Sequence, residues 1–314
     1  MRDYAQRRTT MIKPIPVILD TDIGSDIDDT WALAMLLKSP ELDLKLITTE
    51  QDDTIYKAKL CAKMCEIAGR SDIPIGIGTF TSAQDSNIAD WVKDYDLESY
   101  PNLHRDGVQT LIDTILASDE KIIILAIGPV KTLADAVTKC PEITKKSRII
   151  GLHGNIYNGA LRGMNWYPPL GRESNIWSDL ESYRIVFEQS DWEIEMVPLD
   201  LSGNIRLTPE MYSKVESMRD SDPLINALME NCEIWYKTIK YDFQGTSSCL
   251  FDTVGVYAAI THENLIYERL PIYANDGCIT LIDPTRGKMM DVGLYWKDIN
   301  KFYKFLVSRL CGEI

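Results

Sequence analysis

Short apolar runs alternate with helical patterns up to about residue 200, and this alternation constrains the fold more than any other feature of the sequence. Each run is rich in Ile, Val and Leu and ends at a polar or glycine-containing break, which is typical of a buried strand. Strands that alternate with helices form a mainly parallel sheet with helices on both faces. We therefore predict an α/β fold with an open, mainly parallel but mixed β-sheet.

The expected elements follow from hydrophobic periodicity. Strands are expected at 15–19, 42–49, 73–78, 121–127, 148–152, 193–199, 265–274, 277–283 and 290–295. Helices are expected at 30–37, 54–68, within 102–118, at 179–189, 208–218, 223–241 and 251–260, and in a last segment that ends near residue 310. The Gly-, Asn- and Pro-rich residues 154–174 are expected to form an ordered loop. Because there is neither an internal repeat nor a Pro/Ser linker, we predict an N-terminal tail over residues 1–13 and a single domain over residues 14–314.

The charge balance excludes some classes of partner. The chain has 33 Lys+Arg and 47 Asp+Glu, a net charge of −14, which disfavours nucleic acid and anionic membranes. No apolar run reaches the ~18 residues of a membrane helix, and the apolar stretch behind the N-terminal arginines ends at Asp20, too early for a signal peptide. Seven cysteines without a CxxC pair indicate reduced thiols. We predict a cytoplasmic protein that binds no nucleic acid and no membrane.

An acid-rich turn follows the first expected strand. Asp20, Asp22, Asp26, Asp28 and Asp29 fall within ten residues. Helix capping explains one or two aspartates at such a position, but five crowded carboxylates repel one another. A hard cation that takes oxygen ligands removes the conflict. Since ligands of open α/β sheets lie beyond the carboxyl ends of the strands, the turn predicts a metal or catalytic site.

Two other acidic motifs fit this turn less well. An EF-hand that starts at Asp20 would need a glutamate at its twelfth position, which is Trp31. The DxDx[TV] motif of haloacid dehalogenase-like phosphatases fits partly, with Asp20 as nucleophile, Asp22 as acid and Mg²⁺ as cofactor. It does not account for the three aspartates that follow.

The segment LDTDIGSDIDDTWAL at 19–33 resembles the N-terminal fingerprint DxDxGxDD of the inosine-uridine preferring nucleoside hydrolase family, in a DxDxGxDxDD form that is longer by Ser25-Asp26. Three later segments resemble motifs of the same family in the same order. Residues 126–133 resemble its LGPLTN turn, 173–179 its E-F-N-x-x-x-D segment, and 251–256 its H-D-P-L-A-V segment. The resemblance spans most of the chain and implies a nucleoside hydrolase-like fold.

The resemblance also implies a Ca²⁺ site. Its ligands would be Asp22, Asp29, Asp252 and the main-chain carbonyl of Lys131, a position where the family usually has Thr. The cation would lower the pKa of a water molecule and hold ribose hydroxyls, and Asp22 would accept the proton of that water. Asp26 belongs to the insertion, and its role stays open between support of the site and plain exposure to solvent.

Further residues are implied to bind the sugar. Asp28 would accept a hydrogen bond from a ribose hydroxyl, and Glu173 and Asn175 would hold the hydroxyls further along the sugar. Asp53 stands near the position of a family asparagine that contacts ribose. A site with this many hydrogen bonds to ribose discriminates against deoxyribose, because the sugar then leaves a buried group unpaired.

The leaving-group side departs from the family. Phe251 stands where many members have a histidine, so the preferred base cannot be carried over. His153 follows a strand at the active end of the sheet and is a candidate to meet the ligand. Trp235, Tyr236 and Tyr241 are candidates to stack on the base, although helix packing is the favoured explanation for them.

The sequence as a whole therefore predicts a Ca²⁺-dependent hydrolase that cleaves the N-glycosidic bond of ribonucleosides or related N-ribosides to ribose and free base. The resemblance implies a homo-oligomer with a role in purine or pyrimidine salvage. Two alternatives stay open: a ribose- or nucleoside-binding protein of the same fold with impaired turnover, and the phosphatase.

Overall fold

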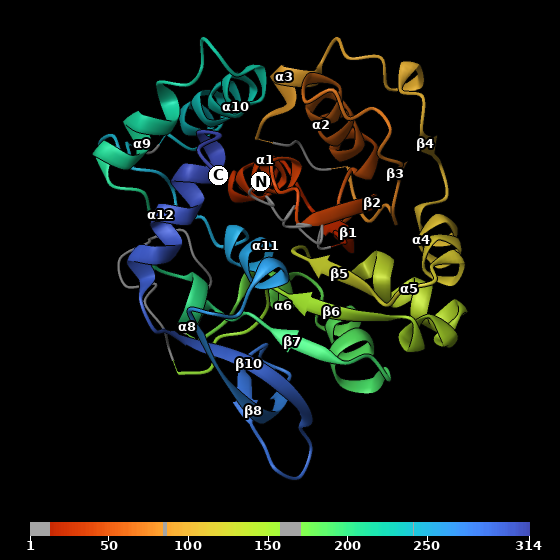
Figure 1. The fold of residues 1–314 in the computed structure, drawn as a ribbon. Helices are drawn as coiled ribbons and strands as arrows, with labels where there is room; N and C mark the ends of the chain where they lie inside the picture. The colour runs from red at the N-terminus through yellow and green to blue at the C-terminus, as the bar shows by residue number, and fades with distance from the viewer. Residues whose placement is uncertain (1–12, 84–86, 158–170, 241) are drawn as a thin grey trace, which may run out of the picture.

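The computed structural model describes residues 13–83, 87–157, 171–240 and 242–314 (Figure 1). Within them, ten strands form one sheet in the order β4-β3-β2-β1-β5-β6-β7-β10-β8-β9. Neighbouring strands are parallel from β4 through to β10, and the pairs β10–β8 and β8–β9 are antiparallel. The predicted α/β fold with a mainly parallel, mixed sheet is confirmed.

The strands are β1 Ile15–Thr21, β2 Leu42–Thr49, β3 Ile75–Gly76, β4 Leu103–His104, β5 Ile122–Ala126, β6 Ser147–Gly151, β7 Ile194–Met196, β8 Leu265–Ala274, β9 Thr280–Ile282 and β10 Lys288–Trp296. The α-helices are α1 Asp28–Leu37, α2 Thr54–Ile67, α3 Ala89–Val92, α4 Gly107–Ala117, α5 Lys131–Lys139, α6 Ser174–Ser178, α7 Leu180–Tyr183, α8 Leu199–Ser202, α9 Pro209–Glu216, α10 Pro223–Ile239, α11 Thr253–Ile260 and α12 Ile299–Leu310. The 3₁₀ turns are η1 Leu97–Ser99 and η2 Pro141–Lys145, and η3 Arg184–Gln189 is a π-helix.

The differences from the expected elements concern short segments. The run expected as a strand at 193–199 contains only the three residues of β7, and α8 begins at its end. The helix expected at 179–189 is divided between α7 and η3, and α6 lies at the end of the segment expected as a loop. Elements of three to five residues are too short to establish a period in the sequence. Residues 1–12 of the expected tail and 158–170 of the expected loop lie outside the described residues.

The sheet separates two apolar cores. Alternate side chains of β1 point to opposite faces, so Val17 and Leu19 enter one core and Ile18 enters the other. The first core is covered by α1, α2, α10, α11 and α12. The second is covered by α4, α5, α7 and η3. Both faces of the central strands are therefore buried, as the uninterrupted apolar runs indicate.

Helix α1 is buried along almost its whole length. Every residue from Asp28 to Leu36 is buried, including the indole of Trp31, which is fully enclosed. The helix packs against α10, α11 and α12 and lies near the centre of that layer (Figure 1). Because a helix that is apolar all round belongs inside a protein, these neighbours fix α1, and its first turn lies at the carboxyl end of β1.

The cysteines are free thiols, in agreement with the expectation of reduced cysteines. All seven cysteines are free thiols, six of them buried and Cys140 partly exposed. No helix in the described parts of the chain is both long and apolar enough to cross a bilayer.

A buried carboxylate joins the parallel and antiparallel parts of the sheet. Glu195 of β7 accepts hydrogen bonds from Arg148 of β6 at 2.9 Å and from the Tyr267 hydroxyl of β8 at 2.6 Å. Tyr267 crosses β10 above Gly293, where an added Cβ would lie 3.1 Å from its ring. His262 Nε2 lies 3.0 Å from the same carboxylate. Burial opposes ionisation of Glu195, but these partners hold its pKa below the usual range.

The Glu195–His262 pair predicts a pH-dependent stability. The hydrogen bond to Glu195 raises the pKa of His262. The stabilisation is therefore fully present below the unfolded value of about 6.5 and is lost as the pH rises through the folded value. We expect the wild type to be more stable than His262→Gln at pH 6 and to lose that advantage at pH 9, as measured by urea unfolding. His104→Gln, which replaces an exposed histidine on β4, is the control, and an advantage that does not change with pH would contradict the assignment.

Candidate active site

A cavity of about 230 Å³ lies at the carboxyl ends of the central strands. Asp22, Ile127, Leu152 and Val197 line it, and each directly follows the last residue of β1, β5, β6 or β7. The other lining residues come from the acid-rich turn, from the β6–α6 and β7–α8 segments and from the start of α11: Ser25, Asp26, Asp28, Asp29, His153, Glu173, Ser174, Asn175, Leu199, Ser202, Phe251 and Asp252. The cavity occupies the position where open α/β sheets bind ligands.

Three buried carboxylates form a cluster in this cavity. Asp28 and Asp29 belong to the first turn of α1, and Asp252 directly precedes α11. Their carboxylate oxygens lie within 4.8 Å of one another, and each residue is at most 4% exposed. Burial, and then the charges of neighbouring carboxylates, raises the pKa of each well above its usual value. Asp28, expected as a sugar contact, thus lies in the same cluster as the two expected ligands.

Asp22 lies in the same cavity outside this group of three. Its main-chain oxygen accepts a hydrogen bond from Lys57 Nζ at 3.0 Å, and Lys57 also donates to the Ser25 hydroxyl at 3.0 Å. Burial raises the pKa of Asp22, and the Lys57 charge partly offsets the effect. Sequence reasoning missed Lys57 because α2 carries three lysines, and only the packing shows that this one is buried.

Asp26 is partly exposed and lines the cavity. Its carboxylate accepts a hydrogen bond from the Ile27 main chain at 2.6 Å. Burial raises the pKa of Asp26 to about 7. Of the two roles left open for the insertion, this position favours support of the site.

Asp20, in contrast, is fully buried behind the cavity. It accepts a hydrogen bond from the Thr48 hydroxyl of β2 and is not among the lining residues. A phosphatase nucleophile must reach its substrate, so the phosphatase interpretation is wrong.

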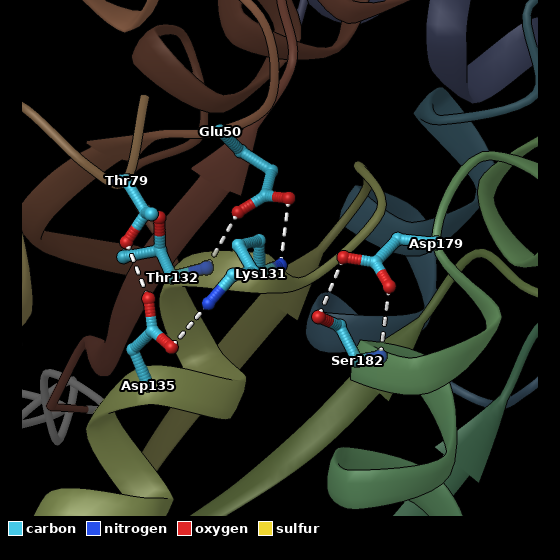
Figure 2. Close-up of polar contacts among 7 residues, drawn as sticks. All are labelled: Glu50, Thr79, Lys131, Thr132, Asp135, Asp179 and Ser182. Atoms are coloured by element: carbon cyan, nitrogen blue, oxygen red, sulfur yellow. Dashed lines mark hydrogen bonds and ion pairs between the residues drawn. The ribbon is translucent and has the colours of Figure 1, made fainter. Parts of the chain in front are cut away.

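The turn after β5 differs from expectation. Lys131 is the first residue of α5, outside the cavity lining, and its ammonium group pairs with Asp135 (Figure 2). A carbonyl in the first turn of a helix points along the helix axis towards the C-terminus. The residue of this segment that lines the cavity is Ile127. Lys131 is therefore not among the residues that line the cavity, and its carbonyl as a cation ligand stays a prediction.

Glu50 holds this turn in place. The residue is fully buried, and its two oxygens accept hydrogen bonds from the main-chain nitrogens of Lys131 and Thr132 at 2.7 and 2.8 Å (Figure 2). Burial raises the pKa of Glu50 to about 7. A Cβ on Gly128 would lie 2.9 Å from the Glu50 side chain and 3.1 Å from that of Asp22, so only glycine fits between them. Sequence reasoning missed Glu50 because nothing in its local pattern marks a cap on a distant helix.

Asp53 is a helix cap and not a lining residue. Its side chain accepts hydrogen bonds from the main-chain nitrogens of Ile55 and Tyr56 at 3.1 and 3.0 Å, and so begins α2. The cap accounts for Asp53 without a ligand, and its expected contact with ribose stays a prediction.

The cap predicts the outcome of substitution at Asp53. Asp53→Ala should lower the free energy of unfolding by about 1 kcal/mol, the usual loss on removing an N-cap, and leave KM unchanged. Asp53→Asn, which keeps an oxygen for the cap, is the matched control. Chemical denaturation and steady-state kinetics test both, and a rise in KM in either variant without loss of stability would restore the sugar contact.

Glu173 and Asn175 form a polar wall of the cavity beside the ends of β5 and β6. Glu173 is buried and accepts hydrogen bonds from three main-chain nitrogens, those of Asn175, Ile176 and Gly154, at 2.7, 3.0 and 3.4 Å. Burial raises the pKa of Glu173 to about 7. The Asn175 amide nitrogen donates to the carbonyls of Ile127 and Leu152, at 3.1 and 3.0 Å. Both side chains are thus fixed by the backbone, and both line the cavity as expected.

The expected leaving-group residues divide into two sets. His153 and Phe251 line the cavity. Trp235 and Tyr236 do not; they pack with Phe243 at ring-centroid distances of 5.7 and 4.7 Å, and Trp235 is 1% exposed. The Trp235 indole nitrogen donates to the Ser25 carbonyl at 3.4 Å, so the aromatic cluster supports the acid-rich turn. Tyr241 lies outside the described residues.

The fold and the site together define a class: an α/β protein whose cavity combines a cluster of buried carboxylates, which could hold a cation, with a polar wall. Residues 17–302 match the family described as inosine-uridine preferring nucleoside hydrolase. The chain belongs to this family, whose activity is hydrolysis of the N-glycosidic bond of ribonucleosides.

Relatives of this chain carry names that agree with this family assignment. The chain is 29% identical over 244 residues to the pyrimidine-specific ribonucleoside hydrolase RihA of Citrobacter koseri, covering 74% of this chain and 75% of that protein. It is 30% identical over 233 residues to the probable uridine nucleosidase 2 of Arabidopsis thaliana, covering 70% and 69%. The inosine-uridine preferring nucleoside hydrolase of Bacillus anthracis superposes with a TM-score of 0.76 at 18% identity, over 96% of this chain and 100% of that chain, and shows the same fold.

The carboxylate cluster predicts a cation-dependent stability. Added to chelator-treated protein, Ca²⁺ should raise the thermal midpoint, since a free concentration one hundred times Kd contributes about 2.7 kcal/mol. Asp252→Asn should remove most of this shift. Asp179→Asn, which alters a helix cap outside the cavity (Figure 2), should keep it. An equal response of wild type and Asp252→Asn in differential scanning fluorimetry would place the cation elsewhere.

Proposed function

We propose that this chain hydrolyses ribonucleosides to ribose and free base in the cavity described above, with Ca²⁺ as cofactor. The observation that carries the proposal is the cluster of Asp28, Asp29 and Asp252 in one cavity with the polar wall of Glu173 and Asn175. The cluster suits a cation, and the wall suits sugar hydroxyls.

The donor set fits a hard cation. Asp29 and Asp252 are the ligands favoured both by the family resemblance and by the geometry, and Asp28 and Asp22 supply further carboxylates. The main-chain ligand that the resemblance implies, the Lys131 carbonyl, stays part of the proposal. Ca²⁺ takes six to eight oxygen ligands, whereas zinc prefers nitrogen and sulfur. When bound, the cation supplies Lewis acidity, which lowers the pKa of water and holds vicinal hydroxyls.

The residues of the chain perform the remaining steps. Asp22 accepts the proton of the attacking water, and Lys57 both fixes its loop and favours its ionised form. The sugar becomes oxocarbenium-like as the glycosidic bond breaks, and the buried carboxylates stabilise this positive charge. Glu173 and Asn175 orient the sugar by accepting hydrogen bonds from its hydroxyls.

The base leaves against an apolar part of the cavity. Val197, Leu199 and Phe251 line it and offer packing to the base. Phe251 cannot protonate the base, in contrast to the histidine common at this position in the family. From the resemblance we extend to this chain a single domain over residues 14–314, a cytoplasmic role in nucleoside salvage and a homo-oligomeric state, which sedimentation analysis tests.

Asp22 provides the sharpest test of the mechanism. Asp22→Asn keeps an oxygen in place but cannot accept a proton, so kcat should fall by roughly 10²–10⁴ while methyl riboside binding survives. Lys131→Ala, outside the cavity, should leave kcat near the wild-type value. Release of free base from inosine, uridine, adenosine and guanosine, with Ca²⁺ or with chelator, provides the measurement.

Three results would contradict the proposal. Near-native turnover of Asp22→Asn would exclude it as the base, and Asp26 would be the next residue to test. Turnover in chelator would exclude the cation. Riboside binding without hydrolysis of any N-riboside would favour the ribose-binding alternative.

A further inference from the structure

Asp26 is the carboxylate that the insertion adds to the family fingerprint, and the proposed mechanism does not use it. The residue is partly exposed and lines the cavity. One of its oxygens accepts the hydrogen bond of the Ile27 main chain at 2.6 Å, directly before α1. The second oxygen of a carboxylate held in this way can still accept from a ligand.

Three distant segments hold the inserted residues in place. The Ser25 carbonyl accepts hydrogen bonds from the Asn87 amide at 2.7 Å and from the Trp235 indole at 3.4 Å. The Ser25 hydroxyl accepts a third, from Lys57 Nζ at 3.0 Å. The packing therefore sets the position of Asp26 before a ligand arrives, which lowers the entropic cost of recognition.

Asp26 lies between the carboxylate cluster and the apolar part of the cavity. After burial, its charge is the largest cause that raises the pKa of Asp28. Burial also raises the pKa of the Cys249 thiol, and the charges of Asp28 and Asp26 add to this effect. Cys249 packs with Leu199 and Phe251 in one small apolar cluster. Asp26 therefore borders the side of the cavity on which the proposed function places the base.

The charge of the lining favours a ligand that is itself positive. The charged side chains of the described lining are all acidic, with no lysine or arginine among them: Asp22, Asp26, Asp28, Asp29, Glu173 and Asp252. A divalent cation offsets two negative charges, so other carboxylates remain to attract positive charge. A lining that combines a carboxylate with an aromatic side chain such as Phe251 suits a cationic ring, through ion pairing and cation–π attraction.

The chemistry of the leaving base indicates the same class of ligand. A neutral base leaves as an anion unless a proton reaches it, and Phe251 cannot supply one. A base whose ring nitrogen carries a fixed positive charge needs no proton. The electron pair of the broken bond between C1′ and that nitrogen neutralises the ring, the water oxygen bonds to C1′, and the water proton goes to Asp22.

We propose that this chain prefers N-ribosides whose base carries a fixed positive charge, such as pyridinium ribosides, and that Asp26 selects them. The inference deepens the proposed function and rests on it, because it names the substrate class of the same cavity. Positive charge moves from the base to the sugar as the glycosidic bond breaks. Asp26, on the base side, therefore stabilises the bound substrate more than the transition state, and its charge acts on KM rather than on kcat.

The kinetic test compares nicotinamide riboside, a pyridinium riboside, with the neutral ribonucleoside turned over fastest. Asp26→Asn keeps an oxygen for the Ile27 main chain but loses the charge. Its KM for nicotinamide riboside should rise about tenfold, the size of one partly desolvated contact with a cationic ring, and its KM for the neutral nucleoside should hardly change. Asp26→Glu should keep part of the preference. Asp113→Asn, which removes a charge from the exposed surface of α4, should keep all of it.

Two kinetic results would overturn the inference. Equal changes on both substrates in Asp26→Asn would assign Asp26 a structural role. A larger loss of kcat on the neutral nucleoside than on nicotinamide riboside would make Asp26 the proton donor to the base.

A binding experiment separates this inference from the proposed function. The pyridinium cation 1-methylnicotinamide and the neutral ring 6-methylnicotinamide have the same size and are titrated into Ca²⁺-loaded protein with ribose. In calorimetry the wild type should bind the cation about tenfold more tightly, and Asp26→Asn should bind both equally. Equal binding by the wild type would overturn the inference even if nucleosides are hydrolysed. If the wild type hydrolyses no N-riboside, the proposed function fails, but this pair still decides whether Asp26 recognises positive charge.

Discussion

The concentration of negative charge at the end of β1 is the constraint on which the rest of the structure depends. Asp22, Asp28, Asp29 and Asp252 are placed together in one cavity, where burial and mutual repulsion oppose their ionised forms. One buried cation of the protein, Lys57, lies close enough to bond the loop that carries them. A protein tolerates such an arrangement when a ligand supplies the missing positive charge, so the cluster suits a cation.

The surrounding apolar structure holds these charges in position. Helix α1 carries two of the aspartates and is enclosed by the sheet and by helices from the C-terminal third of the chain. Asp252 comes from that same third, directly before α11. The cluster therefore forms only when the first and last parts of the sequence pack together, and the first core connects metal affinity to global folding.

The sequence was sufficient for the sheet and for the order of the motifs, because buried strands and dense carboxylates leave strong local patterns. The sequence was insufficient to predict which residues face the cavity and which cap a helix or pack in the core. Lys131 and Ile127 lie four residues apart in the turn after β5, and of the two Ile127 lines the cavity, while Val130 between them has a left-handed conformation. Asp53 and Glu50 are both acids after β2, yet one caps α2 and the other caps α5. Trp235 is of a residue type that often stacks on a base, but its neighbours place it in the core.

Gly128 has a consequence for the packing of the site. Because it is wedged between Glu50 and Asp22, the start of α5, the end of β2 and the acid-rich turn are in mutual contact through a position without a side chain. A side chain at this position would push the three segments apart, so the close packing of the acid-rich turn on the α5 cap depends on the absence of a side chain at residue 128.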